Sequence, residues 1–176
     1  GVSDIVTAFT CDCTTISSEG RRGTIVTNPP YGERLMTPAE AAKKFAAKDA
    51  VVAPYPITWA DKETNLRIAE QHIAALTGKA DIAVLPEMFA TGFCTDHPEL
   101  AETMDGEIIR RLQTAADQSG VAIVSSFICL PTPNAKLVNR GFMIMPNLST
   151  VQIQDKRHLY AHGGEDLFFQ PAEERH

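Results

Sequence analysis

A short apolar run that closes on proline and glutamate limits how this chain can fold more than any other feature. Residues 81–87 read DIAVLPE, a pattern typical of a strand that is buried on both faces and presents a carboxylate at its C-terminal end. Open α/β sheets place their functional groups at this end of their strands. The run therefore predicts an α/β sheet with Glu87 at its functional edge.

The segments around this run have the pattern of helices that pack on a sheet. Residues 61–78 read DKETNLRIAEQHIAALTG, and Gly78 can end the helix that they predict. The apolar face of this helix consists of Leu66, Ala69, Ile73 and Leu76. A second helix is predicted at about 106–118, followed by the apolar strand VAIVSSF at 121–127. This alternation of strand, helix and strand indicates α/β layers.

Farther along the chain the pattern changes to that of a β-hairpin. The runs NRGFMIM at 139–145 and TVQIQ at 150–154 flank the turn-forming residues PNLS. The polar segment DKRHL at 155–159 leaves the second of these strands. Lys156 is therefore expected just beyond a strand end.

The front of the chain differs from this α/β pattern and predicts a separate unit. Residues 4–13 and 24–27 are β-prone, with a polar loop between them. The sequence TPAE, with Thr37 as N-cap, predicts a helix that runs to about residue 48. We therefore expect a first unit at 1–36, a helical junction at 37–50 and an α/β domain at 51–176.

Composition restricts the class of protein further. The 176 residues are 44% hydrophobic and 22% charged, which is typical of globular proteins. A net charge of -6 gives no bulk attraction for nucleic acid, and no apolar run approaches the length of a membrane span. Four irregularly spaced cysteines are expected to be free thiols. These features predict a cytoplasmic protein with no membrane association.

Three motifs, in this order, resemble those of the nitrilase superfamily of carbon-nitrogen hydrolases, especially its ω-amidase-like members. They are LPEMFATGF at 85–93, NRGF at 139–142 and DKRHLY at 155–160. The similarity runs from about Thr58 to Arg175. It implies an α/β fold, the N-terminal half of an α-β-β-α sandwich.

The resemblance also implies a chemistry. Family members cleave an amide by attack of a cysteine thiolate, release ammonia and hydrolyse the resulting thioester. On that pattern Glu87 is the general base, Lys156 stabilises the oxyanion, and Glu165 matches a further acidic position. The expected partner is a small-molecule ω-amide, and no cofactor is implied.

Other readings of the same residues are open. Phe89 and Phe93 are expected to pack in the protein interior rather than to contact a substrate. His158, His162 and Glu165 could be imagined as a metal cluster, but their spacing fits no zinc motif, so packing is favoured and no metal is expected.

The position of the nucleophile is a second open question. The resemblance implies a nucleophilic cysteine on a later strand-to-helix turn, whereas no cysteine follows Cys129 in this sequence. Cys94 is a poor substitute unless it lies within hydrogen-bond reach of Glu87. We therefore expect the chain as given to be inactive.

The first unit resembles a fragment of class I methyltransferases that modify amino groups of nucleobases. The segment TIVTNPPYGERL at 24–35 carries the likeness. It implies that Asn28 and Pro29 hold the target amino group, that Tyr31 stacks on the base, and that Asp12 contacts the adenine of S-adenosylmethionine. The alternative function is thus that of an S-adenosylmethionine-dependent RNA or DNA amino-methyltransferase fragment.

Each of the two motif sets lacks a partner that its chemistry requires, which indicates a fusion of gene fragments. The glycine-rich cofactor loop would lie upstream of Gly1, and the nucleophilic cysteine would lie downstream of Lys156. A third hypothesis is therefore a noncatalytic fragment or subunit. An exposed sheet edge on such a fragment would favour a homo-oligomer.

Overall fold

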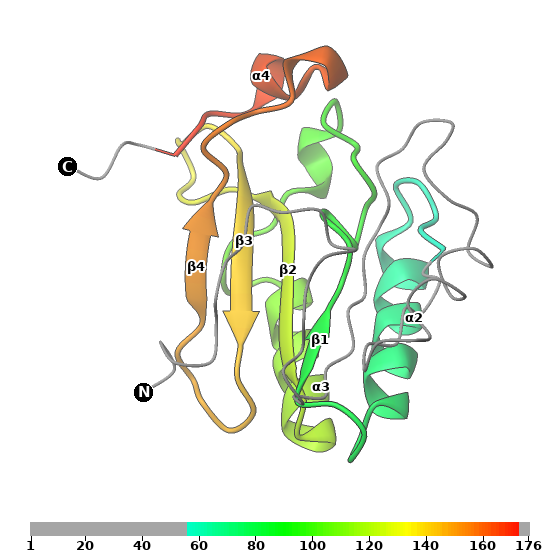
Figure 1. Ribbon diagram of the computed structural model, residues 1–176. Coiled ribbons are helices and arrows are strands. Elements are labelled where there is room, and N and C mark those ends of the chain that lie inside the picture. Colours follow the sequence, from blue (N-terminus) through cyan, green and yellow to red (C-terminus); the bar gives the residue numbers. More distant parts are fainter. Residues whose placement is uncertain (1–55, 173–176) are drawn as a thin grey trace, which may run out of the picture.

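A computed structural model describes residues 56–172 of the chain, and these form a mixed sheet with helices on one face (Figure 1). The predicted strands at 4–13 and 24–27, the helix at 37–48 and residues 51–55 lie outside the described residues. So do the four residues of the methyltransferase hypothesis, Asp12, Asn28, Pro29 and Tyr31. That hypothesis stays a prediction.

The sheet has four strands in the order β1-β2-β3-β4. Their bounds are β1 Ile82–Val84, β2 Ala122–Cys129, β3 Val138–Ile144 and β4 Gln152–Asp155. β1 and β2 are parallel, and the other neighbouring pairs are antiparallel. The C-terminal ends of β1, β2 and β4 therefore lie at one edge of the sheet, the upper edge in Figure 1.

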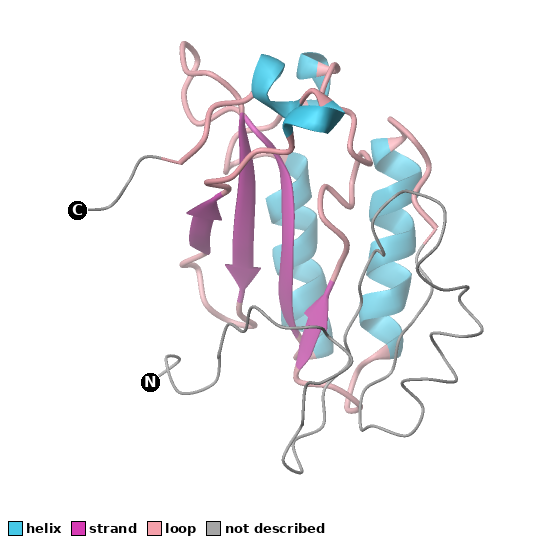
Figure 2. Ribbon diagram, turned by 45° about the horizontal axis from the view of Figure 1, so that its top comes forward, coloured by secondary structure: helices cyan, strands magenta, loops and turns pink. Residues whose placement is uncertain are grey.

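Two helices cover one face of this sheet. They are α2 Lys62–Ala75 and α3 Glu107–Ser119, which pack against each other, and α3 also packs against β2 and β3 (Figure 2). The parallel pair β1 and β2 is joined through α3, which is the crossover that a parallel connection needs. These residues form two layers of the four in the expected sandwich.

Helix α2 confirms the amphipathic pattern. Leu66, Ala69 and Ile73 are fully buried, and Leu76 is partly buried against the same core. The Asp61 side chain accepts a hydrogen bond from the Thr64 amide at 3.0 Å and so caps the start of the helix. Helix α3 and the β3–β4 hairpin are also confirmed, with bounds close to those predicted.

Helix α3 begins with a cap that the sequence pattern did not indicate. Gly106 is the N-cap residue and offers no side chain. The Glu102 carboxylate instead accepts from the Ile108 amide at 2.8 Å and also binds the ammonium of Lys62. A Cβ at position 106 would lie 2.4 Å from this carboxylate, so glycine is required for the cap to close.

The expectation that strand 81–87 is buried on both faces is wrong. β1 has three residues. Ala83 is buried on one face, whereas Ile82 and Val84, which point to the other face, are partly exposed to solvent. Pro86 has no N–H to donate to a ladder, so regular pairing stops soon after the Leu85 amide bonds to Val124 at 2.9 Å. The strand is nevertheless long enough to bring Glu87 to the sheet edge.

Two apolar clusters hold these elements in place. The larger lies between the helices and the sheet and includes Leu112, Ile123 and Phe142. The smaller consists of Met88, Ile128 and Phe169, with Phe93 and Leu159 packed against it. It lies under the short helix α4 Glu165–Phe168 and thus supports the edge at which the polar residues gather. Among residues 56–172, no helix has both the length and the apolar character needed to cross a bilayer.

Candidate active site

Glu87 is held at the C-terminal end of β1 by hydrogen bonds on both sides of it. The Ser125 hydroxyl donates to the Pro86 carbonyl at 2.6 Å, and the Met88 amide donates to the Ser126 hydroxyl at 3.0 Å. Met88 has a positive φ of 49°, a conformation that a non-glycine residue adopts only when its surroundings enforce it. This turn, pinned to β2, aims the Glu87 side chain.

Asn139 lies on the adjoining strand β3, directly opposite Ile128 of β2. Side chains of directly opposed residues point to the same face of a sheet, so Asn139 lies on the face of the smaller cluster. The residue is 2% exposed. A buried amide on this face needs polar partners, and it finds them in two glutamates.

Lys156 follows β4 and is fixed through its backbone. Its amide donates to the Asn139 carbonyl at 2.9 Å, and its carbonyl accepts from the Ala172 amide at 3.0 Å. Both bonds hold the lysine backbone against neighbouring segments of the chain. The long side chain is therefore directed from a rigid base.

Glu165 opens α4 and is completely buried. Gly164 precedes it with φ 72°, a left-handed conformation that lets the chain turn sharply into this helix. The Glu165 carboxylate accepts from the Tyr160 backbone amide at 2.7 Å. This bond ties the 156–164 loop to the helix and places the carboxylate under Lys156.

The four side chains form a connected polar cluster. The Lys156 ammonium lies 2.9 Å from Oε1 of Glu87 and 2.9 Å from Oε2 of Glu165. The Asn139 amide nitrogen lies 2.6 Å from Oε1 of Glu87 and 2.9 Å from Oε1 of Glu165. The structure thus brings together the three residues predicted from the motifs and adds Asn139.

Burial and neighbouring charges shift the pKa of Lys156 in opposite directions. Burial favours the neutral amine, but hydrogen bonds and charge from Glu87 and Glu165 outweigh it and raise the pKa of Lys156 above its ordinary value. The ammonium also lies 5.3 Å from the centre of the Phe93 ring, within cation–π distance. Lys156 is therefore a fixed cation at neutral pH.

The cluster is open on the side of Glu87. The side chains of Glu165, Lys156 and Glu87 are 0%, 27% and 47% exposed, respectively. The gradient places Glu165 at the floor and Glu87 at the opening. A small molecule can therefore reach Glu87 and Lys156 from solvent.

Aromatic residues border the ammonium. Phe93 and Tyr160 meet edge to face with ring centres 6.3 Å apart, and Tyr160 also contacts the His162 ring. Phe89 is fully buried in the larger core, which confirms its predicted packing role. Phe93 packs on the smaller cluster as predicted, but it also contacts Lys156.

The described cysteines do not reach the cluster. The Cys94 thiol is buried and donates to the Thr91 carbonyl at 3.0 Å, and burial raises its pKa. Cys129 is buried in the larger core, and desolvation raises its pKa to about 11. Neither thiol hydrogen-bonds to Glu87 within residues 56–172.

Within the same residues, no group of three or more His, Cys, Asp and Glu side chains is arranged to hold a metal ion. Glu165, the carboxylate of the imagined metal cluster, binds Lys156, Asn139 and the Tyr160 amide instead. These donors engage both of its oxygens. Its partners identify it as part of a hydrogen-bond network.

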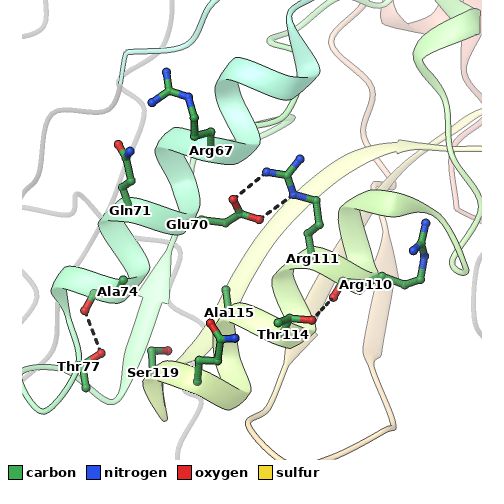
Figure 3. A pocket seen from close by; sticks show the side chains of 11 residues that line it. Arg67, Glu70, Gln71, Ala74, Thr77, Arg110, Arg111, Thr114, Ala115 and Ser119 are labelled. Carbon is green, nitrogen blue, oxygen red and sulfur yellow. Dashed lines mark hydrogen bonds and ion pairs between the residues drawn. The ribbon is translucent and has the colours of Figure 1, made fainter.

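A separate groove of 590 Å³ lies between α2 and α3, away from this cluster (Figure 3). Arg111 spans it and donates to both carboxylate oxygens of Glu70 at 2.7 Å. Arg67 and Arg110 point away from each other in Figure 3, so their charges do not converge on one point. The groove is a polar seam between helices.

Comparisons with known proteins identify the family of the chain. Residues 50–174 match the carbon-nitrogen hydrolase family. The omega-amidase YafV of Escherichia coli K12 is 32% identical over 120 residues, which cover 68% of this chain and 45% of that protein. The omega-amidase YafV of Yersinia enterocolitica is 33% identical over 122 residues with the same coverage. The chain therefore spans less than half the length of these relatives.

Solved structures share the fold. XC1258 from Xanthomonas campestris, a CN-hydrolase superfamily protein with an arsenic adduct in its active site, superposes with a TM-score of 0.62 at 31% identity, covering 68% of this chain and 44% of that one. A single-residue variant of an amidase from Nesterenkonia sp. AN1, with acrylamide added at its active-site cysteine, superposes with a TM-score of 0.59 at 20% identity, covering 68% of this chain and 48% of that one. Residues 1–36 lie outside the family match. With its α/β fold and mixed sheet, the chain belongs to the carbon-nitrogen hydrolases of the nitrilase superfamily.

Proposed function

We propose that this chain supplies the proton-transfer and oxyanion-binding residues of an amidase that hydrolyses small ω-amides through a cysteine thioester. The observation that carries the proposal is the 2.9 Å contact between the Lys156 ammonium and Glu87 at the open end of a buried polar cluster. The names of the related omega-amidases support an ω-amide as the substrate class. Our proposal takes this substrate to be an ω-amide of a dicarboxylic or 2-oxo acid.

In this proposal Glu87 moves protons. It accepts the proton of an attacking thiol, the thiolate bonds to the amide carbon, and the carbonyl oxygen becomes an oxyanion. Glu87 then returns the proton to the amide nitrogen and the C–N bond breaks. Ammonia departs, and a thioester between the cysteine and the acyl group remains. Glu87 next removes a proton from water, which attacks the thioester carbon and releases the acid and the thiol.

Lys156 stabilises the oxyanion. An ammonium has three N–H donors. Two of them bind Glu87 and Glu165, and the third has no acceptor among residues 56–172. A carbonyl oxygen that enters from the open side can accept from it, and one such donor contributes about 3 kcal/mol of transition-state stabilisation.

The nucleophile is the group that the described residues do not supply. Cys94 is buried and donates to the Thr91 carbonyl, and Cys129 is buried in the larger core. The Nesterenkonia amidase of the same fold bears its acrylamide adduct on a cysteine, which supports a thiol nucleophile in this reaction. We therefore expect a polypeptide of these 176 residues alone to release no ammonia.

The test measures ammonia released from glutaramate and succinamate. Two polypeptides are compared. One consists of these 176 residues, and the other is an extended chain that includes any in-frame residues encoded after His176. We expect ammonia release from the extended chain only. In that chain Glu87→Gln should lower the rate roughly 1,000-fold, while the exposed and distant Glu63→Gln should not change it. Ammonia release that survives Glu87→Gln would contradict the proposal.

A further inference from the structure

The amide group of Asn139 bridges two carboxylates. Its nitrogen lies 2.6 Å from Oε1 of Glu87 and 2.9 Å from Oε1 of Glu165, and the residue is 2% exposed. A side-chain amide has two N–H donors, and both are used here. The backbone carbonyl of Asn139 also accepts from the Lys156 amide at 2.9 Å. One residue of β3 thus contacts all three charged members of the cluster.

The two oxygens of Glu87 are not equivalent. Oε1 accepts from Asn139 at 2.6 Å and from Lys156 at 2.9 Å. Oε2 has no hydrogen-bond partner among residues 56–172, and the Glu87 side chain is 47% exposed. Two donors on one oxygen, one of them charged, make that oxygen the poorer proton acceptor. Among the described residues, Oε2 is therefore the oxygen that is left free to accept a proton.

We infer that Asn139 is a positioning residue that holds Glu87 by Oε1 and leaves Oε2 as the atom that takes and returns the proton. The inference rests on the proposed function. In each step the proton of the thiol, or later of water, moves to Oε2, and the Oε2 proton moves to the departing nitrogen. Oε1 keeps its two hydrogen bonds throughout, so Glu87 does not rotate between steps.

Asparagine is the residue type that this position requires. Aspartate has nearly the same shape but no N–H, and it would add a third negative charge next to a single ammonium. Leucine would leave Glu165 buried with fewer donors, which is costly for a carboxylate. Asn139 instead gives each glutamate a neutral donor beside the ammonium of Lys156.

Nuclear magnetic resonance of the 176-residue chain tests the bridge without needing activity. We expect both Asn139 side-chain amide protons to be shifted downfield and to exchange slowly compared with those of the exposed Asn134 and Asn147. One proton should change shift when Glu87 is replaced by glutamine. An amide that served packing alone would show no such change.

Single substitutions separate the two ends of the bridge. Glu87→Gln should move the shift of one Asn139 proton toward that of an exposed amide and leave the other in place, because Glu165 still accepts from it. Glu63→Gln should alter neither proton. Asn139 protons that match those of Asn134 in shift and exchange, or that ignore Glu87→Gln, would overturn the inference.

Kinetics then separate positioning from folding in a polypeptide that releases ammonia. Asn139→Asp should lower kcat about 100-fold, as expected for a misplaced base, while KM changes less than about threefold. Asn139→Asp with kcat unchanged would overturn the inference. A failure of the unsubstituted extended chain to hydrolyse ω-amides would count against the proposed function, while the resonance measurements would still show whether the bridge forms.

Discussion

The fully buried carboxylate of Glu165 lies 2.9 Å from the ammonium of Lys156. A buried charge is tolerated when it is paired and fully hydrogen-bonded, and Glu165 also accepts from Asn139 and the Tyr160 amide. The contact joins the start of α4 to the segment after β4. It therefore links the stability of this edge to the geometry of the candidate site.

Glu165→Leu should lower the free energy of unfolding by about 3 kcal/mol, because it removes one partner of a buried pair and leaves three donors without their acceptor. Glu165→Gln keeps the shape and should cost less, about 1 to 2 kcal/mol. Urea denaturation measures both, with the exposed Glu99→Gln as control. Equal stability of Glu165→Leu and the unsubstituted protein would show that the pair does not form.

The alkaline stability of the protein should depend on Lys156. Because the folded-state pKa of Lys156 is raised, its contribution is fully present below the unfolded value of about 10.4 and is lost as pH rises through the folded value. The difference in unfolding free energy between the unsubstituted protein and Lys156→Met should therefore shrink above about pH 10.4. A difference that stays constant from about pH 7 to 11 would contradict the raised pKa.

Cys94 and Cys129 should resist alkylation in the folded protein. Both thiols are buried, and burial raises the pKa of each, so little thiolate is available near neutral pH. Peptide-resolved mass spectrometry after iodoacetamide treatment should find both unmodified until denaturant is added. Rapid labelling of Cys94 in native buffer would reopen its role as a nucleophile.

The contact between α2 and α3 should depend on the geometry of Arg111. Its guanidinium donates to both oxygens of Glu70 and also binds Glu63, and these bonds raise the pKa of Arg111 further. Lysine keeps the charge but cannot form the paired bonds, so Arg111→Lys should lower the free energy of unfolding by about 1 kcal/mol. Arg110→Lys, next to it and exposed, is the control and should change it by less than about 0.5 kcal/mol.

Much of the fold follows from local sequence patterns. The period of Leu66, Ala69 and Ile73 predicted α2 because burial of one helix face requires that spacing. The hairpin was predictable because turn-forming residues separate two β-prone runs. The length of β1 was overestimated, since an apolar run does not show where pairing stops.

The candidate site was predictable only in part. Glu87 and Lys156 were found through ordered motifs, although 69 positions separate them in the sequence. Asn139 was missed as a site residue because its role depends on the register of β3 against β2, which no local pattern specifies. The available signal was its place at the start of NRGF, the second of the three ordered motifs.

The measurement that tests the shared site most directly is the pKa of Lys156, followed through its side-chain ammonium by nuclear magnetic resonance. We predict a value above the ordinary 10.5 in the unsubstituted chain, lowered by Glu87→Gln and lowered again by Glu165→Gln. Glu63→Gln should leave it unchanged. A Lys156 that titrates at 10.5 in every variant would show that the ammonium and these two carboxylates do not meet.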